Sequence, residues 1–178
     1  MKYFLFLSIL LLITSCYKED VKPHIDASLT GKELPAQESW NSTVFFTDSG
    51  KTKAILYSGH LQLFNDKKET ILDDGLKVEF FNQEEIKTTT LTSKRGRVDE
   101  RTNDLFAIDS VVAVNDSGIV VKTDELTWRN KDQKIVSNKF VTIDSPKEHI
   151  EGFGFESDQH LRNYVIYNIT YITQADKK

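Results

Sequence analysis

The sequence predicts an all-β fold, an antiparallel β-jelly-roll or open sandwich of successive hairpins, preceded by a signal segment and a flexible tether. Three observations predict this fold. Short runs with an apolar residue at every second position continue from about residue 41 to residue 172, and this is the period of half-buried strands. The runs are rich in Thr, Val, Ile, Phe and Tyr, which fit a pleated surface. No long stretch after residue 16 carries the apolar stripe of an amphipathic helix.

The 178-residue chain is predicted to have three parts. Residues 1–15 form a lipoprotein signal peptide, residues 16–40 a lipidated cysteine with a flexible tether, and residues 41–178 the β-jelly-roll domain. A domain of that length buries about two-thirds of its unfolded surface. It therefore needs no disulfide bonds, in agreement with the single cysteine of the chain.

The first element is the signal peptide. Lys2 supplies a positive charge, residues 3–13 are almost entirely apolar, and the small pair Thr14-Ser15 directly precedes Cys16. A charged start, an apolar core and a small-residue cleavage site define a secretory signal. Because cysteine follows at once, residues 13–16 resemble the lipobox of bacterial lipoproteins, which implies acylation of Cys16 and cleavage before it. The alternative is a transmembrane anchor, but about eleven apolar residues are too few to span a bilayer, which takes ~20.

The second element, residues 17–40, is predicted to be a tether. It contains Pro23, Gly31 and Pro35 among charged and small polar residues, without an apolar period of either kind. Such a composition cannot bury enough apolar surface to offset the entropy of ordering.

The third element is the series of strands. Clear alternation occurs at Leu76, Val78 and Phe80, and again in residues 164–172. Residues 115–118, 130–133 and 73–75 have the chemistry of hairpin connections, because Asn and Asp bond nearby backbone groups and Gly accepts positive φ. Gly152-Phe153-Gly154 is predicted to be a bulge or a tight β-corner.

Composition and motif spacing exclude several functional classes. The net charge of −4 gives no broad reason to bind nucleic acid. His24, His60, His149 and His160 are too scattered for a metal site, and the chain lacks the Gly-x-Ser-x-Gly pattern of a nucleophile elbow. We therefore predict no catalytic residue, no metal and no cofactor, and hence no enzyme.

The order of the strand segments resembles one protein family. Residues 123–128 read Thr-Asp-Glu-Leu-Thr-Trp, residues 135–137 read Ile-Val-Ser, and residues 152–158 close with Gly-Phe-Gly-Phe. Over about residues 40–172 this order is similar to the LptC-like proteins of lipopolysaccharide export, which have an OstA-like jelly-roll. The best-known members carry an N-terminal transmembrane helix, and this chain has a lipobox in its place.

The resemblance implies a relay for lipopolysaccharide in the envelope of a Gram-negative bacterium. The domain would be lipid-anchored and face the periplasm, at the inner rather than the outer membrane. It would receive lipopolysaccharide from an inner-membrane ABC transporter and pass it to a periplasmic jelly-roll bridge. A structural or adhesion-type β-sandwich lipoprotein at the surface or in the periplasm is the alternative.

The resemblance also implies two sites. A groove between facing sheets would hold acyl chains, although residues on an inner face can equally be ordinary core. Its candidate lining residues are Leu56, Leu63, Val78, Phe80, Val112, Val114, Val120, Leu126, Trp128, Val136 and Phe140. The last strand would offer a free edge to a partner, unless it is simply the final internal strand. Its candidate residues are Tyr164, Ile166, Asn168, Thr170 and Ile172.

Overall fold

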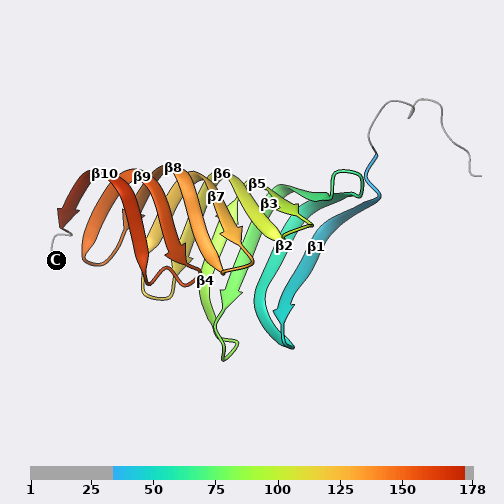
Figure 1. Ribbon diagram of the computed structural model, residues 1–178, viewed down its shortest axis with the longest axis horizontal. Helices are drawn as coiled ribbons and strands as arrows, with labels where there is room; N and C mark the ends of the chain where they lie inside the picture. Colours follow the sequence, from blue (N-terminus) through green and yellow to red (C-terminus); the bar gives the residue numbers. More distant parts are fainter. Residues whose placement is uncertain (1–33, 175–178) are drawn as a thin grey trace, which may run out of the picture. The chain divides into compact units, whose positions relative to one another are not determined.

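The computed structural model describes residues 34–174, and every regular element in that range is a β-strand (Figure 1). The bounds are β1 (Gln37–Asp48), β2 (Lys51–Phe64), β3 (Glu69–Phe81), β4 (Lys87–Ser93), β5 (Arg95–Asp99), β6 (Asp104–Asn115), β7 (Val120–Arg129), β8 (Lys134–Asp144), β9 (Glu148–Asp158) and β10 (Tyr164–Gln174). The strands pair antiparallel in one sheet, so the predicted fold class is confirmed. β1 begins before residue 41, the predicted start of the domain. Within the described residues, no helix has the length and apolar character needed to cross a membrane.

The sheet is a meander in which neighbours along the chain are neighbours in space. The order is β1-β2-β3-β4-β6-β7-β8-β9-β10, and β5 pairs with β3 and β6. β4 and β5 together fill one position and are separated only at Lys94. The Lys94 N–H donates to the Asp109 carbonyl, and its own carbonyl accepts from the Gly75 N–H, both at 3.0 Å. The interruption is thus bonded to both neighbouring strands.

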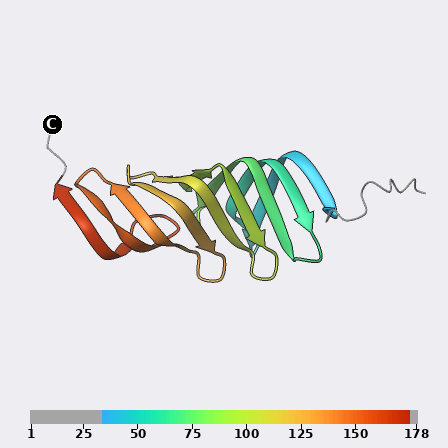
Figure 2. The same ribbon diagram turned by 90° about the horizontal axis from the view of Figure 1, so that it is seen from above.

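Most strands are also bent near their middle. The pairing register shifts between Ser58 and His60 in β2, and between Ile108 and Val111 in β6. Comparable shifts fall between residues 123 and 127 in β7 and between residues 137 and 140 in β8. Extra residues in one strand of a pair bend it and increase its twist. The sheet therefore curls over on itself, as the strands of Figure 2 do.

The bends divide the sheet into two facing layers, and we call the whole a roll. Layer A holds residues 43–58, 76–93, 111–123 and 140–153, and layer B holds residues 60–73, 95–108, 126–137 and 155–166. The Trp128 ring of layer B lies 5.5 Å from Phe46 and 5.4 Å from Phe80, measured between ring centroids. Both phenylalanines belong to layer A. Since β7 pairs with neither β1 nor β3, these contacts cross the interior between the layers.

Turn chemistry predicts two connections correctly and one wrongly. Residues 115–118 and 130–133 lie at the β6–β7 and β7–β8 connections, as predicted. Residues 73–75 lie inside β3 and not in a hairpin, because Asp74 and Gly75 form the bend with φ of 58° and 93°. A bend within a strand and a hairpin turn both require positive φ, so they select the same residues. Gly154, with φ of 77°, lies at the corresponding bend of β9.

Candidate functional site

An apolar cavity opens at the β1 end of the roll, and we call it the mouth. Its volume is about 350 Å³. Strands of both layers line it, with the β5–β6 connection at its rim. The lining residues are Gln37, Val44, Phe46, Leu56, Leu61, Leu63, Thr70, Leu72, Val98, Glu100 and Asn103.

The mouth exists because β1 is the first strand of the sheet and has a neighbour only in β2. Val44 and Phe46 are only partly buried and pack against the core from this end. The edge of the Phe46 ring meets Trp128, which is 1% exposed, so Phe46 marks the boundary between the mouth and the packed interior. The mouth is therefore an apolar space that lies outside the packed interior.

A second, polar cavity adjoins the mouth, and we call it the cleft. Its volume is about 380 Å³, and Phe46 and Asn103 line both spaces. Thr47, Asp48 and Lys53 of layer A face Asn130, Lys131 and Gln133, which connect strands of layer B. The cleft thus lies on the seam where the free margins of the two layers meet.

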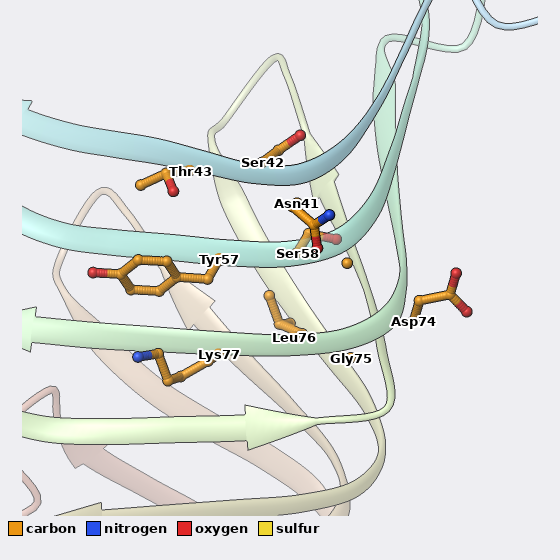
Figure 3. Close-up of a pocket in the computed structure, with 10 residues that line it drawn as sticks. Asn41, Ser42, Thr43, Tyr57, Ser58, Asp74, Gly75, Leu76 and Lys77 are labelled. Carbon is orange, nitrogen blue, oxygen red and sulfur yellow. The ribbon is translucent and has the colours of Figure 1, made fainter.

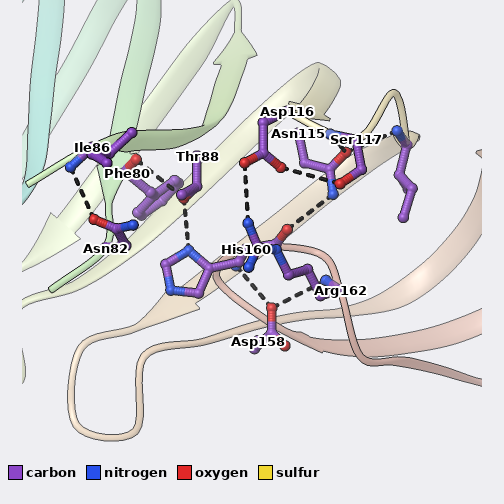
Figure 4. Close-up of polar contacts among 11 residues, drawn as sticks. Phe80, Asn82, Ile86, Thr88, Asn115, Asp116, Ser117, Asp158, His160 and Arg162 are labelled. Carbon is purple, nitrogen blue, oxygen red and sulfur yellow. Dashed lines mark hydrogen bonds and ion pairs between the residues drawn. The ribbon is translucent and has the colours of Figure 1, made fainter. Parts of the chain in front are cut away.

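The same seam is closed farther along by the β9–β10 loop, residues 159–163, which we call the clasp (Figure 4). Leu161 is 0% exposed and belongs to the core cluster. The Asn115 Nδ2 donates to the His160 carbonyl at 3.0 Å, and His160 Nδ1 lies 2.6 Å from Thr88 Oγ1. Arg162 pairs with Asp116 at 3.1 Å. These partners belong to layer A, so the clasp ties the end of β9 in layer B to the margin of layer A.

A third hollow, of about 400 Å³, lies at the bend of β1, β2 and β3 (Figure 3). It shares no lining residue with the mouth. Asp74 and Lys77 are the charged residues of its lining. The Lys77 ammonium lies 4.2 Å from the centroid of the Tyr57 ring and 3.3 Å from Glu79. Burial opposes the lowering of the Glu79 pKa, but hydrogen bonds and attraction from Lys77 outweigh burial and hold that pKa below its usual value. The strands approach closely here, since a Cβ added at Gly59 would lie 2.3 Å from the Asp74 carbonyl oxygen.

The structure places the predicted groove residues in three different environments: the lining of the mouth, the packed core and the outer face of the roll. Leu56 and Leu63 line the mouth. Val78, Phe80, Leu126 and Trp128 are fully buried in the core behind it.

The inward orientation predicted for the other five groove residues is wrong. Val114 and Phe140 are each 40% exposed on the outer face of layer A, where Val112 and Val120 also lie, and Val136 lies on the outer face of layer B. Their chain neighbours Val111, Ala113, Val121, Ile135 and Val141 are buried instead. In each of these runs apolar residues occupy consecutive positions, so the period of two leaves undetermined which of them face the core.

The sequence prediction also omitted most of the mouth. Val44 and Phe46 stand two residues apart in β1, and this spacing was a usable signal for a common face. Leu61, Leu72 and Val98 come from three strands, and only the curl of the sheet brings them together.

The predicted docking edge is a true edge of the described sheet, because β10 pairs with β9 alone. Tyr164 and Ile166 pack partly against the core, whereas Asn168, Thr170 and Ile172 are exposed. Ile172 of β10 pairs with Ile150 of β9, which is buried. The Ile172 side chain therefore continues the inner apolar face of the sheet, but no further strand covers it.

The remaining feature is the arrangement of the histidine and carboxylate side chains. No group of three or more His, Cys, Asp and Glu side chains within residues 34–174 is arranged to hold a metal. His149 lies on layer A, 2.6 Å from Asp144 and 3.2 Å from Glu151. Hydrogen bonds from the imidazole to these two carboxylates, Asp144 first, raise the His149 pKa. The predicted lipidation residue Cys16 lies outside the described residues.

A family model described as lipopolysaccharide-assembly, LptC-related, matches residues 4–172. No curated protein matches the chain significantly.

Proposed function

Because the chain belongs to the LptC-related family of lipopolysaccharide-assembly proteins, we propose that it is a membrane-anchored relay in lipopolysaccharide export. The family acts in lipopolysaccharide transport in the Gram-negative cell envelope. In our proposal the chain is held by acyl groups on Cys16 and faces the periplasm. It receives lipopolysaccharide from an inner-membrane ABC transporter and passes it to a periplasmic jelly-roll bridge, without breaking or forming a covalent bond.

The observation that supports this proposal most is the apolar mouth. An acyl chain that crosses water needs continuous apolar cover, since each exposed CH₂ costs ~0.8 kcal/mol. The mouth offers such cover at an open end of the roll, where both layers contribute aliphatic side chains. The lining is already formed in the free protein, so binding there requires little ordering.

The packed core behind the mouth limits how far a chain can enter. Phe80 and Trp128 fill the space between the layers, and the clasp holds the seam shut farther along. We infer that lipid first occupies the mouth and moves deeper only when the layers separate. Among the described residues, no hydrogen bond or ion pair of the clasp reaches β1 or β2, so we infer that separation begins at the β1 end.

The two end strands of the described sheet fit the remaining steps. β1 leaves one edge unpaired beside the mouth, and β10 leaves the other. Unpaired N–H and C=O groups accept an added strand readily. We assign the β1 edge to the transporter and the β10 edge to the bridge, so that lipid would pass along one continuous apolar face.

Site-specific photo-crosslinking in cells tests the relay. A photoreactive residue at Leu63, in the mouth, should capture lipopolysaccharide, and capture should require ATP hydrolysis by the transporter. The matched control is Val112, which is also partly buried but lies on the outer face, and it should capture none. Equal capture at both positions, or capture of protein alone at Leu63, would contradict the proposal.

A further inference from the structure

We propose that the cleft beside the mouth binds the phosphate group of a lipid headgroup through Lys53 and Lys131. This inference rests on the proposed function, because it assigns the polar end of a molecule whose acyl chains occupy the mouth. It adds a second subsite that recognises charge.

The position of Lys53 results from a bulge. Phe46 pairs with Ala54 and Thr47 pairs with Thr52, so Lys53 is the extra residue of β2. A bulge re-aims the side chain of its extra residue, and Lys53 lines the cleft while Ala54 beside it is fully buried. Without the bulge, regular alternation would carry Lys53 to the outer face.

Lys131 approaches from the opposite layer. It lies in the connection between β7 and β8, which ends layer B at the seam. Two cations from different layers thus face one space of about 380 Å³. A phosphate with several oxygens can accept hydrogen bonds from both ammonium groups at once.

Neither ammonium group is neutralised within residues 34–174. No carboxylate there pairs with Lys53 or Lys131, although Lys77, Lys87, Lys122 and Lys134 are each paired. One carboxylate, Asp48, also lines the cleft, and its Oδ1 accepts a hydrogen bond from Ser49 at 3.1 Å. Two cations against one anion leave a positive balance in a chain whose net charge is −4.

The remaining side chains of the cleft suit a sugar phosphate. Asn103, Asn130 and Gln133 carry amides, and an amide both donates and accepts hydrogen bonds. Phe46 and Asn103 line the mouth as well, so a ligand that fills both spaces has its polar and apolar ends in contact. An amphiphile with an anionic phosphorylated headgroup satisfies both cavities.

Binding assays with the full-length lipoprotein in detergent test the assignment. The probes are lipid A with its phosphates, dephosphorylated lipid A, and phosphatidylglycerol. The variant Lys53→Gln/Lys131→Gln should bind phosphorylated lipid A about tenfold more weakly than the wild type and dephosphorylated lipid A equally well. The control Lys94→Gln/Lys147→Gln removes the same charge away from the cleft and should match the wild type.

The phosphatidylglycerol arm identifies the source of the phosphate. A tenfold loss with lipid A but not with phosphatidylglycerol assigns the cleft to lipid A, and a loss with both assigns it to phosphorylated lipids in general. An unchanged affinity for phosphorylated lipid A, or an equal loss with and without phosphates, would overturn the inference and leave the relay intact. If the wild type bound none of the probes, the relay itself would fail.

Discussion

Leu161 is the residue through which the clasp enters the core. Its side chain is 0% exposed, although it belongs to a loop between two edge-proximal strands. Its φ of 55° is unusual for leucine, and hydrogen bonds on both sides hold the loop in this conformation. The Asp158 Oδ1 accepts from the N–H groups of His160 and Arg162 at 2.9 and 3.2 Å.

We expect Leu161→Ala to lower the free energy of unfolding by about 3 kcal/mol, because truncating a buried leucine loses burial and leaves a cavity. Urea unfolding measures this change. The control Val165→Ala removes an aliphatic side chain that is 55% exposed and should change stability by less than about 0.5 kcal/mol. Equal effects of the two substitutions would show that the loop does not hold the layers together.

The pairing of His149 predicts a dependence of stability on pH. The Asp144 carboxylate, and after it Glu151, raises the His149 pKa by hydrogen bonding. The same contact lowers the Asp144 pKa. A raised histidine pKa contributes stability that is complete below the unfolded value of about 6.5 and is lost as the pH rises through the folded value.

The urea midpoint of the wild type should therefore fall between pH 6 and pH 8 more than that of His149→Gln. Asp144→Asn should remove most of the same difference, because it removes the main partner of the imidazole. Parallel pH profiles for all three proteins would refute the assigned cause.

At the scale of elements, β10 combines a free edge with an apolar inner side. Ile169 pairs with Gly152, which is buried, yet Ile169 is itself 55% exposed. Tyr167 lies on the outer side, where a Cβ at Gly154 would come within 3.0 Å of its ring. The inner apolar side of β10 is therefore exposed, and an added strand would cover it.

We expect Ile169→Lys to abolish co-purification with the jelly-roll bridge, because an inward charge at an edge opposes strand addition. Tyr167→Lys places the same charge on the outer face of the same strand and should preserve the complex. Thermal unfolding of both variants should match the wild type, since neither position is buried. Retention of the complex by Ile169→Lys would argue against docking at β10.

Elements also show what local sequence can and cannot determine. The strands and most connections follow from alternation and turn residues, because both are local properties. The sequence could not distinguish the bend at Asp74-Gly75 from a hairpin turn, because both structures require residues that accept positive φ. β3 pairs with β2 both before and after the bend, and only this pairing shows that the strand continues.

For the roll as a whole, the seam between the two layers is closed at one end and open at the other. The clasp joins the layers near the β9–β10 connection, whereas at the β1 end the mouth and the cleft open between them. The mouth and the cleft adjoin each other where β1 leaves the sheet incomplete, whereas the hollows at the bends of β1–β3 and of β6–β8 lie apart from them. A molecule with an apolar and a polar end has one entrance that suits both.

A bulky side chain placed in the mouth should block lipid binding without unfolding the protein. We expect Leu63→Trp to reduce the lipopolysaccharide that co-purifies with the protein to background, because the indole occupies the aliphatic cavity. Stability should change by no more than about 1 kcal/mol, since the cavity already has room.

The matched control for this variant is Val112→Trp, which adds the same ring to the outer face and should leave lipid binding unchanged. Undiminished binding by Leu63→Trp would show that the acyl chains lie elsewhere.

The sequence by itself determined the all-β class, the antiparallel hairpins and the resemblance to the LptC family, because alternation, β-branched residues and turn chemistry act over a few residues. The tertiary structure alone decided which faces are inside. In residues 111–114 and 135–136 both faces are apolar, so only packing against the opposite layer selects Val111 and Ile135 over Val112 and Val136. The mouth and the cleft were likewise out of reach of the sequence, because a curled sheet assembles each of them from strands far apart in the chain.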